Sequence, residues 1–319
     1  MLLTPEILTL DILNFLFLAF ATIAFYFSLK IVVYYDASAT TPRQYSLEKQ
    51  SYLVATIIKF IFAIKIPLFI FFIFTLNKIA TLLPGAMCAA GVVNATVYGT
   101  PLLLLKIINL YLFGYWIVLN YEDMKTPQQR YLRLKFLLFC IVYVLFVIEI
   151  VTQFVMFASI DVNSVVDCCG AIFSTTSQTY MAKLLGLPHA VLLSLFYGLF
   201  LIMALFYFMK NSYLYAVANA LFLPISIITL IAFFGTYIYE LPTHHCPFCL
   251  LQKDYFYIGY LLYVLLFMGT FFGFIVGVVE FSKQEKKKYC RLSFIANILY
   301  VLIVSAYPIL FFIKNGVWL

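Results

Sequence analysis

The chain has 319 residues, of which 65% are hydrophobic and only 10% are charged, and its mean hydropathy is +1.05. This composition excludes a soluble globular protein of the same length. Apolar runs of about 20 residues recur along the whole chain, which is typical of a polytopic helical membrane protein in contact with membrane lipid. The net charge of +7 comes from basic residues in short segments between these runs, so we predict no nucleic-acid partner.

We predict eight transmembrane helices, because backbone groups inside lipid must be hydrogen-bonded within their own segment. The fold class expected from the sequence is therefore an all-α polytopic membrane protein. The expected spans, in chain order, are residues 8–35, 52–79, 101–120, 136–158, 187–209, 213–239, 255–281 and 293–313.

The basic residues gather on alternate connections between these spans. Thirteen Lys and Arg residues fall on one side of the expected membrane, four fall on the other side, and three lie within spans. The positive-inside rule puts the richer side in the cytoplasm and both termini outside. Five of the seven cysteines and all three histidines then lie at the outer face, which suits disulfide chemistry in an oxidising compartment.

The segment THHCPFCLLQ, at residues 243–252, carries the most distinctive motif of the chain. Pro247 suits the first position of a helix, so we expect Cys246 and Cys249 in the first turn of the seventh span. The partial positive charge of a helix N-terminus favours a thiolate, and His245 adds positive charge when it is protonated. The motif therefore indicates thiol–disulfide chemistry, with a structural disulfide or a soft-metal site as the alternatives.

Two predicted outer loops carry the other outer cysteines. Cys88 lies in a glycine-rich loop at residues 82–100, and the adjacent Cys168 and Cys169 lie in a longer loop at residues 159–185. The second half of the longer loop has an amphipathic pattern, which predicts a short helix along the membrane surface. Such a helix serves either as a lid over a pocket or as an ordinary surface element.

The order of these motifs resembles the vitamin K epoxide reductase family, including its bacterial homologues. The motifs are the aspartate-led loop DVNSVVDCCGAIFST, then LLGLPHAVLLSLFYG, then a helical hairpin, then CPFC. The resemblance covers residues 136–281 and implies that spans four to seven form a four-helix redox bundle. Residues 1–135 would add three helices and the Cys88 loop, and residues 282–319 a basic cytoplasmic loop and the last helix.

Members of this family oxidise thiols to disulfides and pass the electrons to a quinone, here ubiquinone or menaquinone. The resemblance implies that Cys249 faces the quinone and that Cys246 exchanges with a loop cysteine. Aligning CGAIFST makes that loop cysteine Cys169, whereas aligning DVNSVVDC makes it Cys168. Thr175 would then be the hydroxyl that hydrogen-bonds a quinone carbonyl.

His245 and Tyr255 are further candidates for contact with the quinone. The resemblance also implies a separate thioredoxin-like thiol protein as partner, a prokaryotic inner membrane, and an active site at the periplasmic face. On this interpretation we expect no metal ion at the site. The alternatives are a metal- or haem-handling membrane protein that uses the same Cys and His residues, or a non-enzymatic subunit of a membrane complex with structural disulfides.

The loop departs from the family pattern at one position. The family usually has a second cysteine just before the aspartate, whereas Ile160 precedes Asp161 here. A disulfide between adjacent cysteines is strained, because it wants Cα atoms at about 5–6 Å and neighbours are held at about 3.8 Å. We therefore expect Cys88 to pair with Cys168 or Cys169, either as part of a shuttle or as a static staple.

Two opposite charges fall in the middle of predicted spans. Lys65 and Glu149 each lie about 13 residues from the inner end of a span, which is roughly 20 Å deep at the helical rise. Isolated charges at this depth are expensive, so they pair or line a polar cavity. We predict that the two side chains face each other; the alternative is that each meets backbone carbonyls or water separately.

Overall fold

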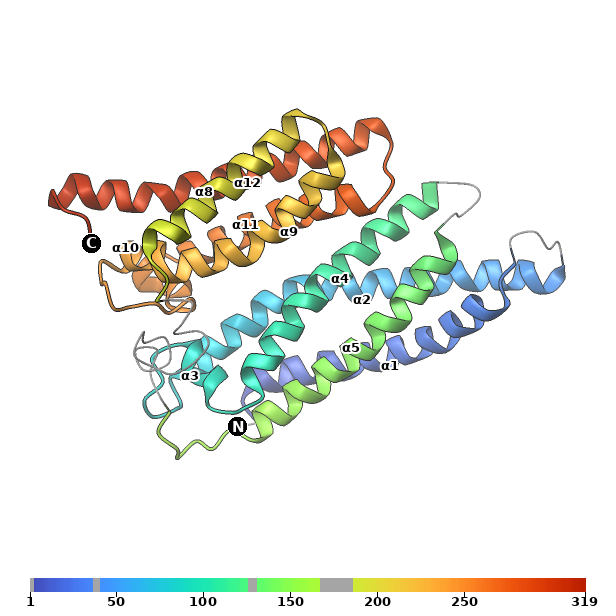
Figure 1. Ribbon diagram of the computed structural model, residues 1–319. Helices are drawn as coiled ribbons and strands as arrows, with labels where there is room; N and C mark the ends of the chain where they lie inside the picture. Colours follow the sequence, from blue (N-terminus) through green and yellow to red (C-terminus); the bar gives the residue numbers. More distant parts are fainter. Residues whose placement is uncertain (1–2, 37–40, 126–130, 167–185) are drawn as a thin grey trace. The chain divides into compact units, whose positions relative to one another are not determined.

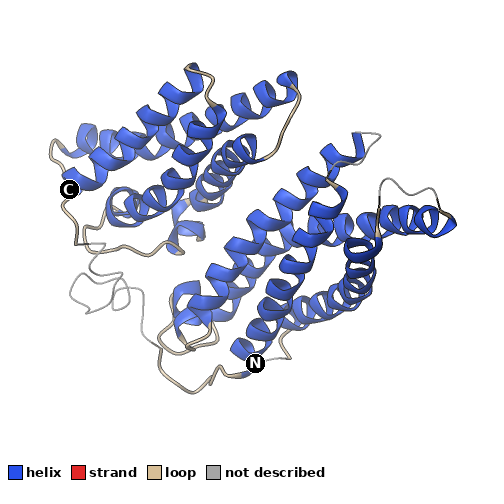
Figure 2. Ribbon diagram, turned by 45° about the vertical axis from the view of Figure 1, so that its right-hand side comes forward, coloured by secondary structure: helices blue, strands red, loops and turns tan. Residues whose placement is uncertain are grey.

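The structure is a computed structural model that describes residues 3–36, 41–125, 131–166 and 186–319. The described residues form helices and their connections, and none of them lies in a strand (Figure 2). Eight helices among them are long and apolar enough to cross a membrane. The predicted all-helical class is confirmed, and the chain is an integral membrane protein.

The chain divides into two compact units, each with four spans (Figure 1). The first unit contains α1 (Pro5–Tyr34), α2 (Pro42–Ala80), α4 (Gly99–Lys125) and α5 (Leu132–Ala158). The second contains α8 (His189–Phe208), α9 (Ser212–Thr229), the π-helical segment η1 (Leu230–Phe234), α10 (Gly235–Tyr239), α11 (Ile258–Val278) and α12 (Lys283–Asn315). A short helix, α3 (Ala89–Asn94), lies between α2 and α4 in the chain.

This grouping differs from the bundle predicted for residues 136–281. The fourth span, α5, packs against α1 and α4, and the eighth span, α12, packs against α11. Polar side chains explain the difference. Glu149 on α5 takes its partners from α2 and α4, whereas Asn297 on α12 pairs with Asn219 on α9.

The predicted contact between Lys65 and Glu149 is confirmed, with Nζ and Oε1 3.0 Å apart. Lys106 on α4 is a third member that the prediction did not include, and its Nζ lies 2.7 Å from the same oxygen. All three side chains are buried. The carboxylate therefore ties three helices of the first unit together. In the apolar core of the same unit, Phe62 stacks on Phe113 with ring centroids 4.4 Å apart.

The second unit packs closely along the glycines of α11. A Cβ atom on Gly269 would lie 2.0 Å from Asn297 Oδ1, and one on Gly273 would lie 2.3 Å from Asn219 Cγ. The two asparagines are hydrogen-bonded to each other, with Nδ2 of Asn297 donating to Oδ1 of Asn219 at 2.9 Å. Small residues that admit a polar pair are a usual means of association between membrane helices.

Two helices extend about ten residues beyond the expected spans, because capping sets their start and hydropathy does not. Thr41 accepts a hydrogen bond from the backbone N–H of Gln44 at the start of α2. At the start of α12, the Ser282 hydroxyl accepts from the backbone N–H of Glu285 and donates to the Glu285 carboxylate, so Ser282 is the N-cap. The extended first turns carry the charged residues that the apolar pattern excluded.

The predicted orientation can be tested with cysteines placed at exposed loop positions. Val97 is 89% exposed in the predicted outer connection before α4, and Gln284 is exposed at the predicted inner start of α12. In a background with all seven native cysteines replaced by serine or alanine, a membrane-impermeant maleimide applied to intact cells should label Val97→Cys. Gln284→Cys should react only after permeabilisation. The opposite pattern would reverse the orientation and move Cys246 and Cys249 to the cytoplasmic side.

Candidate active site

Three cysteine sulfurs meet in the second unit, which also includes residues 85–91 from the connection between α2 and α4. Cys88 directly precedes α3, Cys246 lies in the loop after α10, and Cys249 opens the 3-10 turn η2 (Cys249–Leu251). The Sγ atoms of Cys88 and Cys246 are 3.4 Å apart. All three Sγ atoms lie within 4.8 Å of one another. We call these three residues the cysteine triad.

The cysteine triad is buried, with side chains that are 0%, 1% and 5% exposed for Cys88, Cys246 and Cys249. Burial at this level excludes large reagents and folded partner proteins from the sulfurs in this conformation. Exchange among the three sulfurs is therefore favoured over exchange with thiols in bulk solvent. A reaction with an outside protein requires either an opening movement or another cysteine as carrier.

The prediction that Cys246 and Cys249 lie in the first turn of the seventh span is wrong. The chain continues from η2 into a second 3-10 turn, η3 (Lys253–Tyr255), and α11 begins only at Ile258. Phe256 and Tyr257 have left-handed backbone conformations, with φ of 54° and 56°. The charged side chains of η3 stay exposed, which keeps this stretch out of the apolar helix. Cys246 and Cys249 therefore lie outside the first turn of α11.

Two tyrosine hydroxyls hold the C-x-x-C backbone in place. Tyr239, the last residue of α10, donates to the carbonyl of Cys246. Tyr263 on α11 donates to the carbonyl of Pro247 at 2.7 Å. These carbonyls lie outside regular helix, so the hydroxyls supply partners that the backbone itself does not. Sequence reasoning missed both tyrosines, because the chain has 25 tyrosines and nothing marks these two.

The same segment also packs tightly against its neighbours. A Cβ atom on Gly259 would lie 2.8 Å from Leu250 Cβ, so the first turn of α11 admits only glycine against the C-x-x-C segment. Nε2 of Gln252 donates to the carbonyl of Met87 at 2.8 Å. This bond fixes the residue next to Cys88 to the end of the C-x-x-C segment, across 165 residues of sequence. The two cysteine-bearing segments are therefore held together by more than the sulfur contact.

His245, which directly precedes Cys246 in the chain, is buried, and its ring points at the π-helical segment η1. Its Nδ1 lies 3.1 Å from the carbonyl oxygen of Ile231 in η1. A carbonyl only accepts, so Nδ1 carries a proton, and in the neutral ring Nε2 is the basic nitrogen. Single π-helical turns are frequent at functional sites. The hydrogen bond to Ile231 thus fixes the orientation of the His245 ring.

Tyr255 stands at the edge of the site, against the ring of Tyr239 at a centroid distance of 4.7 Å. Burial raises the pKa of the Tyr255 phenol, and the nearby Cys249 and Asp254 raise it further. The phenol therefore stays neutral and can donate a hydrogen bond at neutral pH. This suits the predicted contact with a quinone carbonyl, which remains a prediction.

Several predicted site residues lie outside the described residues, namely Cys168, Cys169 and Thr175. The expected pairing of Cys88 with Cys168 or Cys169 therefore stays a prediction, as does the amphipathic helix of the same loop. Cys140 lies on α5 of the first unit, and Cys290 packs against a cluster around Met203 and Tyr215.

Comparisons with protein-family models, with curated proteins and with solved structures find no match to this chain. The cysteine geometry and the order of the motifs are therefore the observations from which a function can be inferred.

The contact between Cys88 and Cys246 should be trapped as a disulfide on mild oxidation. The sulfurs are 3.4 Å apart, and a disulfide needs about 2.05 Å, so a small movement suffices. Cys249→Ser removes the competing partner and should yield a Cys88–Cys246 bridge. Cys88→Ser should yield Cys246–Cys249 instead. Non-reducing peptide mapping distinguishes the two products.

Cys290→Ser is the matched control, because Cys290 lies outside the triad, and it should change neither product. If Cys88 and Cys246 both still react with an alkylating reagent in oxidised Cys249→Ser protein, the two sulfurs do not form a disulfide and the prediction is wrong.

Proposed function

We propose that this chain is a membrane thiol–disulfide oxidoreductase that forms disulfides at the outer face and passes the electrons to a quinone. The observation that carries the proposal is the contact of Cys88 with Cys246 beside Cys249. A C-x-x-C pair with a third buried sulfur at its first cysteine can move a disulfide from one partner to another. The resemblance to vitamin K epoxide reductases supports the same chemistry.

The first step oxidises the C-x-x-C pair. The thiols of Cys246 and Cys249 lose two protons and two electrons and form a disulfide. The quinone takes up two electrons and two protons and becomes a quinol. Nε2 of His245 is suited to accept one of the thiol protons, because Nδ1 is occupied by the Ile231 carbonyl.

The second step transfers the disulfide within the triad. The Cys88 thiolate attacks the Cys246 sulfur, the Cys246–Cys249 bond breaks, and Cys249 leaves as a thiolate. The product is a Cys88–Cys246 disulfide. Cys246 is the central sulfur of this exchange, since it bonds to each of the other two in turn.

The third step exports the disulfide to a substrate. The burial of the triad calls for a carrier, and the resemblance assigns this role to Cys168 or Cys169. Its thiolate would attack Cys246, the Cys88–Cys246 bond would break, and Cys88 would leave as a thiolate. A thiolate of a separate thioredoxin-like protein at the outer face would then attack the carrier sulfur and release Cys246, and the partner's second thiolate would displace the carrier and complete the partner's disulfide. The net reaction converts two substrate thiols and one quinone into one disulfide and one quinol. We place the enzyme in a prokaryotic inner membrane, because the loop charges and the resemblance both favour a periplasmic site.

Quinone reduction by purified full-length protein tests the proposal. With a reduced thioredoxin-like substrate and either ubiquinone or menaquinone, Cys246→Ser and Cys249→Ser should each lower turnover by about 100-fold or more. Cys290→Ser should leave turnover unchanged.

Cys88→Ala separates the steps of the reaction. It should stop steady-state turnover yet still allow one round of quinone-dependent oxidation of Cys246 and Cys249. If both C-x-x-C variants retain normal turnover, the enzyme proposal fails.

A soft-metal site is the second candidate function, and the triad geometry favours it specifically. Three thiolates around one ion at a metal–sulfur distance of about 2.3 Å stand about 4 Å from one another. The Cys88–Cys246 distance of 3.4 Å and the 4.8 Å limit for all three pairs bracket that value. Thiolate ligands select soft ions, of which copper(I) suits a three-sulfur site.

An anaerobic copper(I) titration against a competing chelator distinguishes this candidate. The fully reduced protein should bind one ion per chain, and serine at any position of the triad should abolish competitive binding. Cys290→Ser should bind as the unmodified protein does. Tight one-to-one binding together with no quinone turnover would replace the redox proposal with metal handling, and absence of binding would remove the metal candidate.

A further inference from the structure

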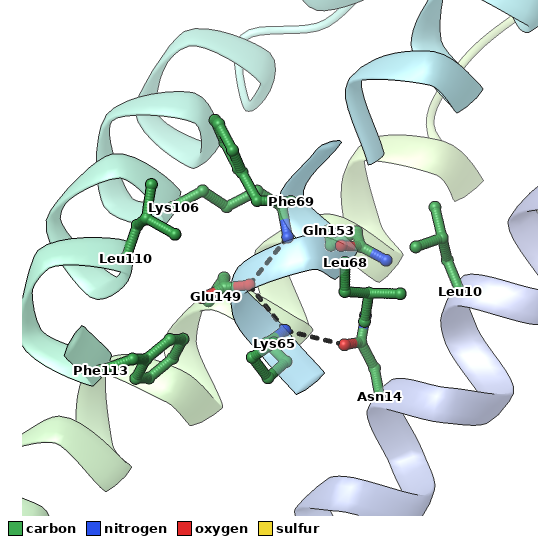
Figure 3. A pocket seen from close by; sticks show the side chains of 10 residues that line it. All are labelled: Leu10, Asn14, Lys65, Leu68, Phe69, Lys106, Leu110, Phe113, Glu149 and Gln153. Atoms are coloured by element: carbon green, nitrogen blue, oxygen red, sulfur yellow. Dashed lines mark hydrogen bonds and ion pairs between the residues drawn. The ribbon is translucent and has the colours of Figure 1, made fainter. Parts of the chain in front are cut away.

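The buried charge centre of the first unit has more positive than negative charge. Lys65 and Lys106 both bind Oε1 of Glu149, at 3.0 and 2.7 Å, as Figure 3 shows. Oε2 of the same carboxylate accepts from Nδ2 of Asn109 at 2.6 Å. Two ammonium groups thus share one carboxylate oxygen at the middle of the spans. A lone excess charge in this environment is expensive.

Asp11 is the other charged group that faces this centre. It lies on α1, one turn before Asn14, and its Oδ1 accepts from Nε2 of Gln153 at 3.1 Å. Asp11 interacts electrostatically with Lys106 but forms no ion pair with a described residue. It is only partly buried. The groups that face Lys106 are therefore Asp11 from α1, Lys65 from α2 and Glu149 from α5.

The two lysines differ in their hydrogen bonds. Lys65 donates to Oδ1 of Asn14 at 2.9 Å as well as to Glu149. Lys106 donates to Glu149 and otherwise lies over the ring of Phe72, with Nζ 4.4 Å from the centroid. Among the described residues, the Lys65 ammonium thus has two hydrogen-bond acceptors, whereas the Lys106 ammonium has one. Lys106 can lose a proton and keep its bond to the carboxylate through another N–H.

A small cavity adjoins Lys106. It has a volume of about 10 Å³, and its lining includes Asn14, Lys65, Lys106, Glu149 and Gln153 (Figure 3). Space of this size holds about one water molecule. Oε1 of Gln153 is buried and accepts no hydrogen bond from any residue that the structure describes. An acceptor at the cavity beside ammonium donors suits a group that both donates and accepts, as water does.

We propose that this centre is a proton-binding site in which Lys106 carries the exchangeable proton. On release, an N–H bond of the Lys106 ammonium breaks and its electron pair stays on Nζ. The proton passes through the cavity beside Gln153 to the partly exposed Asp11 carboxylate, where an O–H bond forms; that bond then breaks as Asp11 gives the proton to water and becomes charged again. What remains buried is the Lys65–Glu149 ion pair, whose charges cancel, so release to water removes the excess buried charge. This role is independent of the thiol chemistry of the second unit.

Nitrogen NMR of lysine-labelled full-length protein in lipid nanodiscs tests the proposal, since ammonium and amine nitrogens give distinct signals. Lys106→Met and Lys65→Met assign the two lysines of this centre. Lys49→Met assigns an exposed lysine on the same helix as Lys65 but before the predicted span 52–79, which serves as the internal reference. Lys106 should convert to the amine at a lower pH than both Lys65 and Lys49. If Lys106→Met does not fold, Lys106→Arg removes the same signal while keeping the charge.

Asp11→Asn tests whether the Asp11 carboxylate acts on Lys106. Removing this negative charge disfavours the Lys106 ammonium, so the conversion of Lys106 should move to still lower pH, while that of Lys49 stays in place. The proposal is overturned if Lys106 keeps its proton to as high a pH as Lys49 does. An unchanged Lys106 conversion in folded Asp11→Asn protein would overturn the assignment of Asp11.

Discussion

Polar side chains buried between these helices must find their partners inside the protein, because lipid offers none. In the first unit, Glu149 binds Lys65 and Lys106 and so brings three helices to one point. In the second unit, the Asn219–Asn297 pair fits against the glycines of α11 and does the same. Removing one member of a buried ion pair costs about 3–5 kcal/mol. These few polar contacts therefore join spans of the same unit.

The same constraint shapes the cysteine triad. Its segments lie outside regular helix, and irregular backbone near a membrane is tolerated where other groups satisfy it. The Tyr239 and Tyr263 hydroxyls and the Gln252 amide perform this task. The sulfurs are consequently positioned by side-chain anchors from α10 and α11 rather than by a helix N-terminus.

The hydropathy of the sequence was sufficient to predict the eight spans. The similar depths of Lys65 and Glu149 in their predicted spans were sufficient to predict that the two side chains pair. The grouping of the spans was not predictable, because Asn219 and Asn297 become informative only once their partners across α11 are known. Lys106 is one of the three basic residues counted within spans, and the sequence assigned it no partner. The late start of α11 had a signal that was overlooked, since Lys253 and Asp254 interrupt the apolar pattern between CPFC and Ile258.

The contact of Cys88 with Cys246 joins residues 158 positions apart, and no local pattern encodes it. Its placement makes Cys246 the sulfur that both candidate functions require. A disulfide between Cys246 and either neighbour removes two of the three thiolates that a soft ion would need. Metal binding, conversely, would stabilise the fully reduced triad and oppose its oxidation. The two chemistries are thus mutually exclusive at one atom, and the redox state of Cys246 determines which of them the site can perform.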